Sequence, residues 1–181
     1  MPPYDARAVA NTIVAMAAGT GQRVSHLKLQ KLLFLCHAFY IVSRGRPLVK
    51  REFEAWKRGP VHRDVYEAFR KYSRRPIDQP AERLDPVRRT WSIIAPVEDD
   101  DVVAVMRRVL DFYLGWSARQ LVDLTHAKEG PWDYVVRNAE VQANLGFRIP
   151  DRIVLQRFRH HWGVMRHAEG PDEPDEDQPF A

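Results

Sequence analysis

One stretch of sixteen residues, 25–40 (SHLKLQKLLFLCHAFY), constrains the fold more than any other part of the chain. Its apolar residues recur at the three- and four-residue spacing of one helical face, and further apolar residues widen that face beyond half the circumference. They are Leu27, Leu29, Leu32, Leu33, Leu35, Cys36, Phe39 and Tyr40. Ser25 is a good N-cap, and Gly45 followed by Pro47 predicts the end of the helix. A helix of this kind belongs in the middle of a domain.

The rest of the chain reads as shorter helices joined by glycine- and proline-rich breaks. Helical spacing and capping residues predict helices over about 5–18, 60–73, 99–115, 117–126, a short one from 131 and a last one from 150. Residues 47–56 and 89–95 favour short strands that could pair with each other, and the proline-containing residues 74–86 favour a loop. The prediction is a mainly α (α+β) fold, a single compact helical domain with at most a small sheet of two or three strands.

Charge divides the chain into a basic body and an acidic end. Residues 1–167 would form the domain, and residues 168–181 would be a disordered tail that carries six acids and no Lys or Arg. Between Arg44 and Arg75 there are eleven bases and four acids. Such a surface attracts nucleic acid or an acidic protein partner, and it is also typical of a plain solvated surface. The tail could fold back on the basic face as a salt-sensitive screen.

Targeting and redox features point to the cytoplasm. No stretch approaches the ~18–20 apolar residues of a membrane span. Asp5 and Asn11 stand where a signal peptide has a basic region and then an apolar run. Cys36 is the only cysteine, so no intrachain disulfide can form, and its place on the apolar stripe predicts a small core residue.

Motifs for catalysis, metals and cofactors are missing from the sequence. The seven histidines are scattered without an HExxH pattern, and the adjacent His160 and His161 would point about 100° apart on a helix. There is no GxSxG elbow, no GxxxxGK[ST] loop and no GxGxxG loop. Burial would make Cys36 a poor nucleophile. We therefore predict no metal, no cofactor and no enzymatic activity.

Several polar residues stand out because they interrupt apolar patterns. Lys28 and Lys31 lie three apart on the central helix, where they could anchor an acidic partner or simply cover the edge of the core with their stems. His126 ends a predicted helix, where it could satisfy backbone carbonyls or donate to a ligand. Trp56 is either a core or rim anchor or an interface hot spot.

Taken in order, these residues fall in three motifs that resemble one family, the Panacea domain. Residues 27–34 (LKLQKLLF) look like its KLQKLLY motif, with Phe34 where tyrosine is commoner. Residues 54–61 (EAWKRGPV) look like its EAWxxGPV motif, and residues 121–132 (LVDLTHAKEGPW) match its LxxLTH…PW signature. The resemblance covers about residues 4–162.

The resemblance implies an antitoxin of a bacterial toxin–antitoxin system that neutralises a toxin encoded beside it. Known members include SocA-like antitoxins and phage-associated proteins, and in the SocA-like case the antitoxin is an adaptor that hands the toxin to the ClpXP protease. The family has no established catalytic residues. Its motif residues are candidates for partner binding (Lys28, Gln30, Lys31, Trp56, His126, Trp132) or for the fold itself (Gly59, Pro60, Val61, Thr125, Pro131).

An alternative rests on charge alone. The basic region could belong to a nucleic-acid-binding or transcription-associated protein of phage or mobile-element origin. Other Panacea proteins carry an added helix-turn-helix, and nothing in these residues supplies one, which weakens direct DNA regulation. A small phage enzyme of unknown chemistry is a third hypothesis, without a residue pattern in its favour.

Overall fold

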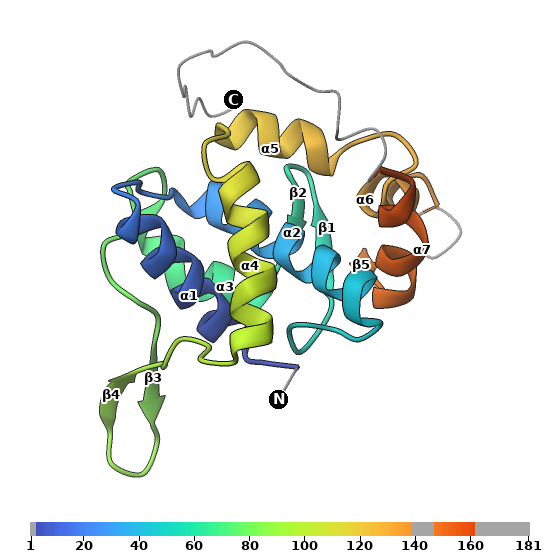
Figure 1. The fold of residues 1–181 in the computed structure, drawn as a ribbon. Helices are drawn as coiled ribbons and strands as arrows, with labels where there is room; N and C mark the ends of the chain where they lie inside the picture. The colour runs from blue at the N-terminus through green and yellow to red at the C-terminus, as the bar shows by residue number, and fades with distance from the viewer. Residues whose placement is uncertain (1–2, 139–146, 162–181) are drawn as a thin grey trace.

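A computed structural model describes residues 3–138 and 147–161 as a mainly α fold with a small β component (Figure 1). The α-helices are α1 (Ala6–Gly19), α2 (His26–Arg44), α3 (Arg63–Phe69), α4 (Asp100–Tyr113), α5 (Ala118–Thr125), α6 (Pro131–Arg137) and α7 (Asp151–His161), and a 3-10 turn, η1 (Arg70–Tyr72), follows α3. The strands are β1 (Phe53–Trp56), β2 (Gly59–Val61), β3 (Glu82–Asp85), β4 (Thr90–Ile93) and β5 (Arg148–Ile149). The predicted fold class is confirmed.

Helix α2 is the centre of the domain, as its apolar circumference predicts. It contacts α1, α3, α4, α5, α7 and strand β2, and in Figure 1 α1 and α4 lie on one side of it while α7 lies on the other. The hydroxyl of Ser25 accepts a hydrogen bond from the Lys28 amide, and Gly45 adopts the left-handed conformation that ends the helix. Cys36 is fully buried, and burial raises the pKa of its thiol to about 12. These local predictions are confirmed.

The small sheet differs from the predicted pairing. Strand β1 pairs antiparallel with β2 on one side and with β5 on the other, so residues 89–95 do not pair with the Phe53 segment. The helix predicted from Pro60 begins instead at Arg63, because residues 59–61 are taken up as the edge strand β2. Proline is tolerated there because an edge strand does not need every amide.

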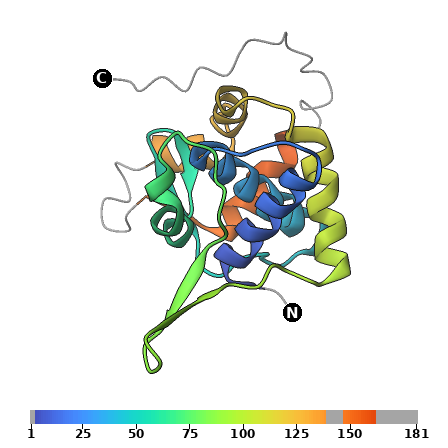
Figure 2. The ribbon, with the colours of Figure 1, turned by 90° about the vertical axis from the view of Figure 1, so that its left-hand side faces the viewer.

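Residues 82–93 form a separate β3–β4 hairpin, part of which falls in the segment predicted to be a loop. The hairpin projects from the helical body in both views (Figures 1 and 2). Leu84 lies opposite Trp91 in the register, and with Ile93 these side chains form an exposed apolar face. Phe112 is a further exposed large apolar residue, on helix α4.

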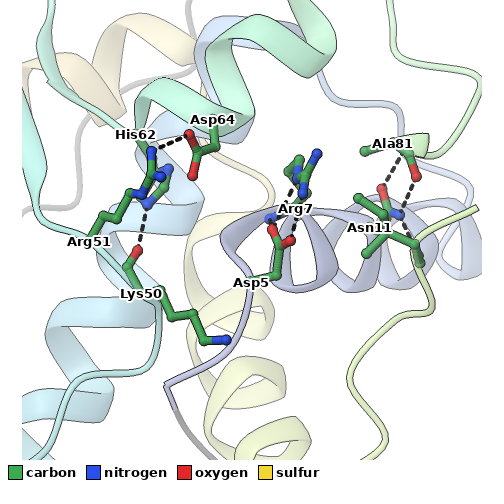
Figure 3. Close-up of polar contacts among 9 residues, drawn as sticks. Asp5, Arg7, Asn11, Lys50, Arg51, His62, Asp64 and Ala81 are labelled. Atoms are coloured by element: carbon green, nitrogen blue, oxygen red, sulfur yellow. Dashed lines mark hydrogen bonds and ion pairs between the residues drawn. The ribbon is translucent and has the colours of Figure 1, made fainter. Parts of the chain in front are cut away.

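Asn11 attaches this hairpin to helix α1 (Figure 3). Its amide nitrogen donates to the carbonyl oxygens of Ala81 (3.1 Å) and Ile94 (2.7 Å), and its amide oxygen accepts from the Ala81 amide at 2.7 Å. One buried side chain therefore holds both ends of the hairpin, just before β3 and just after β4.

Some sequence predictions fall outside the described residues. They are the disordered tail over 168–181 and the side chains of His160 and His161. Among the helices that are described, none is both long and apolar enough to span a bilayer.

Candidate functional site

The three motifs meet in space around the Gly59–Pro60 bond. Helix α2 brings Lys31, the β1–β2 hairpin brings Gly59 and Pro60, and the end of α5 brings Thr125 and His126. These segments are up to about a hundred residues apart in the chain. We call the residues Lys31, Trp56, Gly59, Pro60, Thr125, His126 and Trp132 the motif cluster.

Lys31 lies at the centre of the motif cluster with no exposed surface. Its ammonium donates to the Pro60 carbonyl oxygen at 2.9 Å, which is its one hydrogen bond among the described residues. Burial without a carboxylate partner lowers the pKa of Lys31 from 10.5 to about 7. The sequence allowed two interpretations of Lys31, an anchor for an acidic partner or a stem that covers the edge of the core. Its full burial fits neither position.

Gly59 is required by both backbone conformation and space. Its φ of +94° is one that residues with a Cβ rarely adopt. A Cβ placed there would stand 2.9 Å from Lys31 Nζ, 2.9 Å from Thr125 Oγ1 and 3.2 Å from His126 Nε2. The three polar atoms therefore surround the space that the missing side chain leaves.

The connection from α5 to α6 closes the motif cluster. The His126 ring stacks on the Trp132 ring, with centroids 3.8 Å apart and planes 9° apart. The Trp132 indole N–H donates to the Trp56 carbonyl oxygen at 2.9 Å, which joins α6 to strand β1. His126 Nε2 is buried without a hydrogen-bond partner in the described part of the chain, and burial is the main cause that lowers the pKa of this histidine.

Gln30 attaches the other end of β2 to helix α2. Its side-chain oxygen accepts from the His62 amide at 2.8 Å, and its amide nitrogen lies 3.4 Å from the His62 carbonyl oxygen. The His62 ring reaches the Lys50 carbonyl oxygen at 2.9 Å, near the Arg51–Asp64 ion pair (Figure 3). Burial lowers the pKa of His62. Gln30 thus supplies the edge strand with a side-chain hydrogen-bond partner.

The remaining predicted site residues are also mostly internal. Lys28, Val61 and Pro131 are buried, and Pro131 is at the first position of α6, where its fixed φ suits a helix start. The cavity that touches Thr125 and Pro131 has a volume of about 10 Å³, room for a single water. The motif cluster as it stands is a packed junction between elements.

A much larger pocket of about 490 Å³ lies beside the junction, between the N-terminal end of α2, the β1–β2 hairpin and α3. It is lined by His26, Leu27, Gln30, Trp56, Lys57, Arg58, Val61, Tyr66, Ser73 and Arg74. Of the residues singled out in the sequence, Gln30, Trp56 and Val61 reach this pocket. His26 and Tyr66 were not predicted from the sequence, whereas the charge excess over 44–75 is a signal that includes Lys57, Arg58 and Arg74.

Comparison with known proteins agrees with the motifs. The family model for the SocA-like antitoxin, Panacea domain, matches residues 29–133, which include the whole motif cluster. The chain therefore belongs to the family of SocA-like antitoxins. It is 41% identical over 166 residues to Antitoxin SocA of Caulobacter vibrioides (strain NA1000 / CB15N), a match that covers 88% of each chain. No solved structure matches.

Proposed function

We propose that this chain is an antitoxin that acts in the cytoplasm by binding a cognate toxin protein, without catalysis of its own. The observation that carries the proposal is the 41% identity to Antitoxin SocA over 88% of both chains. Identity of this extent covers the motif cluster and the helices around it, so the two proteins would present related surfaces. The toxin would be the product of the neighbouring gene.

The finer form of the proposal is that the chain works as a proteolytic adaptor. It would hold the toxin and deliver it to the ClpXP protease, as the family resemblance implies. In that form, neutralisation requires two contacts, one with the toxin and one with the protease, whereas occlusion of the toxin requires only the first.

The test is co-expression of this chain with the neighbouring gene product, followed by tagged purification in moderate salt. A stable complex, together with toxicity that appears only when this chain is missing, is the expected result. If there is no complex, no rescue of growth and no change in toxin half-life, the proposal is wrong. Expression of the neighbouring gene with an unrelated soluble protein is the control.

A strain without ClpX separates the two mechanisms. An adaptor predicts that the toxin accumulates and growth stops in that strain even though this chain is present. Occlusion predicts that growth is still rescued. Removal of residues 169–181 tests whether the acidic tail contacts the protease, since unchanged toxin turnover would exclude that role.

The second candidate, nucleic-acid binding, is supported by the net charge of the 44–75 region. Part of that charge is already paired within the protein, as in the Arg51–Asp64, Arg63–Glu54 and Arg70–Glu67 ion pairs. Phosphate-driven binding should be strongest at low salt and fall steeply as salt is added. A gel-shift titration at low salt that detects no DNA affinity would exclude it.

A further inference from the structure

We propose that the pocket between the N-terminal end of α2, the β1–β2 hairpin and α3 binds an acidic segment of the partner protein. The inference rests on the proposed function and adds to it the surface and the chemistry of the contact. The occupant is a stretch of the toxin that carries Asp or Glu side chains next to an apolar residue.

The size of the pocket suits a few side chains of another protein. Its volume is about 490 Å³, in the range of pockets that enclose a small ligand. Lys57 and Arg58, the turn residues of the β1–β2 hairpin, line the pocket and are exposed to solvent. A segment of a folded partner could therefore enter from outside without any movement of the helices.

The charge of the pocket selects the occupant. Lys57, Arg58 and Arg74 line it, and no Asp or Glu is among the lining residues. In the described part of the chain, neither the Lys57 ammonium nor the Arg74 guanidinium forms an ion pair, whereas Arg51 and Arg63 nearby do. Glu54, on strand β1 next to the pocket, accepts a hydrogen bond from the Trp56 indole at 2.7 Å and pairs with Arg63. The positive charges of Lys57 and Arg74 thus remain available for carboxylates of a partner.

One wall of the pocket is aromatic. The Tyr66 ring contacts both the Trp56 ring, with centroids 4.7 Å apart, and the His26 ring, with centroids 5.1 Å apart. Trp56 and Tyr66 line the pocket and are only partly buried, so an apolar side chain of a partner can pack against them. Aromatic residues beside cations are the composition that protein interfaces favour.

His26 adds an unsatisfied polar atom to this wall. Its Nε2 is buried without a hydrogen-bond partner among the described residues, which is costly in the free protein. Burial, with a smaller contribution from Lys31, lowers the pKa of His26 to about 4, so the ring is neutral at pH 7. A neutral imidazole can donate to a carboxylate or accept from an amide once an entering segment shifts the ring toward it.

The motif cluster holds these walls in place. Trp56 lines the pocket with its side chain and accepts the Trp132 indole N–H on its carbonyl oxygen, and Gln30 lines the pocket and bonds the His62 backbone. The buried residues of the motif cluster would therefore serve binding indirectly, because they position the walls of the pocket. The residues that touch the partner would include Lys57, Arg58 and Arg74 at the rim.

The test compares two double charge reversals that change the net charge equally. Lys57→Glu with Arg74→Glu alters the pocket, and Arg83→Glu with Arg88→Glu alters exposed positions of the β3–β4 hairpin. The affinity for the purified neighbouring gene product is measured by calorimetry at about 50 mM and about 300 mM salt. We expect the pocket variant to bind at least about tenfold more weakly at low salt and to lose most of the salt dependence, while the hairpin variant stays within about twofold of the wild type.

The outcomes separate the inference from the proposed function. If the wild type binds and the pocket variant binds equally well, the inference is overturned and the antitoxin proposal stands. If the wild type itself does not bind, both fall. If the pocket variant loses affinity only for a 20-base-pair DNA duplex and keeps its affinity for the protein, the pocket is a nucleic-acid site and the inference is overturned. Lys57 and Arg74 are exposed, so we expect the pocket variant to fold normally. An unfolding temperature equal to that of the wild type verifies this.

Discussion

The ammonium of Lys31 lies 2.9 Å from the carbonyl oxygen of Pro60, inside the protein and without a carboxylate in its hydrogen-bonding shell among the described residues. The contact joins the central helix to the edge strand β2, and Gly59 leaves the space for it. Since a buried, unneutralised cation is unfavourable, the free energy of folding should depend on whether this amine is protonated.

Stability should therefore rise with pH near neutrality. Folding lowers the pKa of Lys31 from 10.5 to about 7, so between these values the unfolded chain holds a proton that the folded chain has lost. The free energy of unfolding should increase by roughly 1–2 kcal/mol between about pH 7 and about pH 8.5. Urea unfolding at several pH values measures it.

Lys31→Met provides the comparison, because it removes the titration and roughly keeps the volume. The variant should show a flatter dependence on pH over the same range, and the difference between the two curves is the Lys31 contribution. Burial raises the pKa values of Cys36 and Tyr113 to about 12, so above that range these groups lower the free energy of unfolding as the pH rises. The measurement therefore stops below about pH 9. Parallel curves would show that Lys31 stays protonated in the folded protein.

Gly59→Ala should be strongly destabilising. The substitution forces alanine into a φ of +94° and places its Cβ 2.9 Å from Lys31 Nζ and Thr125 Oγ1. We expect a loss of about 2–4 kcal/mol in the free energy of unfolding, measured by chemical denaturation. Gly115→Ala is the matched control, since a Cβ there meets no atom within 4 Å, and it should change stability by less than about 1 kcal/mol.

Two substitutions of Trp132 should separate its hydrogen bond from its ring stacking. Trp132→Phe keeps an aromatic ring for His126 to stack on but loses the bond to the Trp56 carbonyl oxygen, so it should cost about 1 kcal/mol. Trp132→Ala loses both and should cost about 2–4 kcal/mol. Thermal and urea unfolding of the two variants measure the difference, and equal losses would contradict a separate role for the hydrogen bond.

Asn11→Ala should loosen the β3–β4 hairpin. It removes three hydrogen bonds and leaves buried backbone groups of Ala81 and Ile94 without their partner, which should cost about 2–4 kcal/mol. Hydrogen exchange of the Ala81 amide should accelerate more than that of amides in α2. Trp91→Ser is the control: this side chain is 65% exposed, so its removal should leave stability within about 0.5 kcal/mol.

Local signals in the sequence were enough to place most helices. Asp5 accepts a hydrogen bond from the Arg7 amide at the start of α1, and Ser117 forms a capping box with Gln120 at the start of α5. Each is the first residue of a helical range predicted from the sequence. The predicted helix boundaries fall within a few residues of the observed ones. The start predicted at Pro60 is the exception in kind, since Pro60 belongs to strand β2. There the same proline that suits a helix start also suits an edge strand, and the pairing of β1 with β2 decided between them.

In the candidate site, too, some features follow from the local sequence and others from tertiary packing. The sequence by itself determined the central helix, the caps and the three motifs that mark the family, because these depend on residues that are neighbours in the chain. Only the tertiary structure decided that Lys31 is buried against Pro60, that Trp132 bonds Trp56, that β3 pairs with β4, and that His26, Tyr66 and Arg74 share one pocket. Each of these depends on groups far apart in the sequence, whose meeting is determined by how the whole core packs.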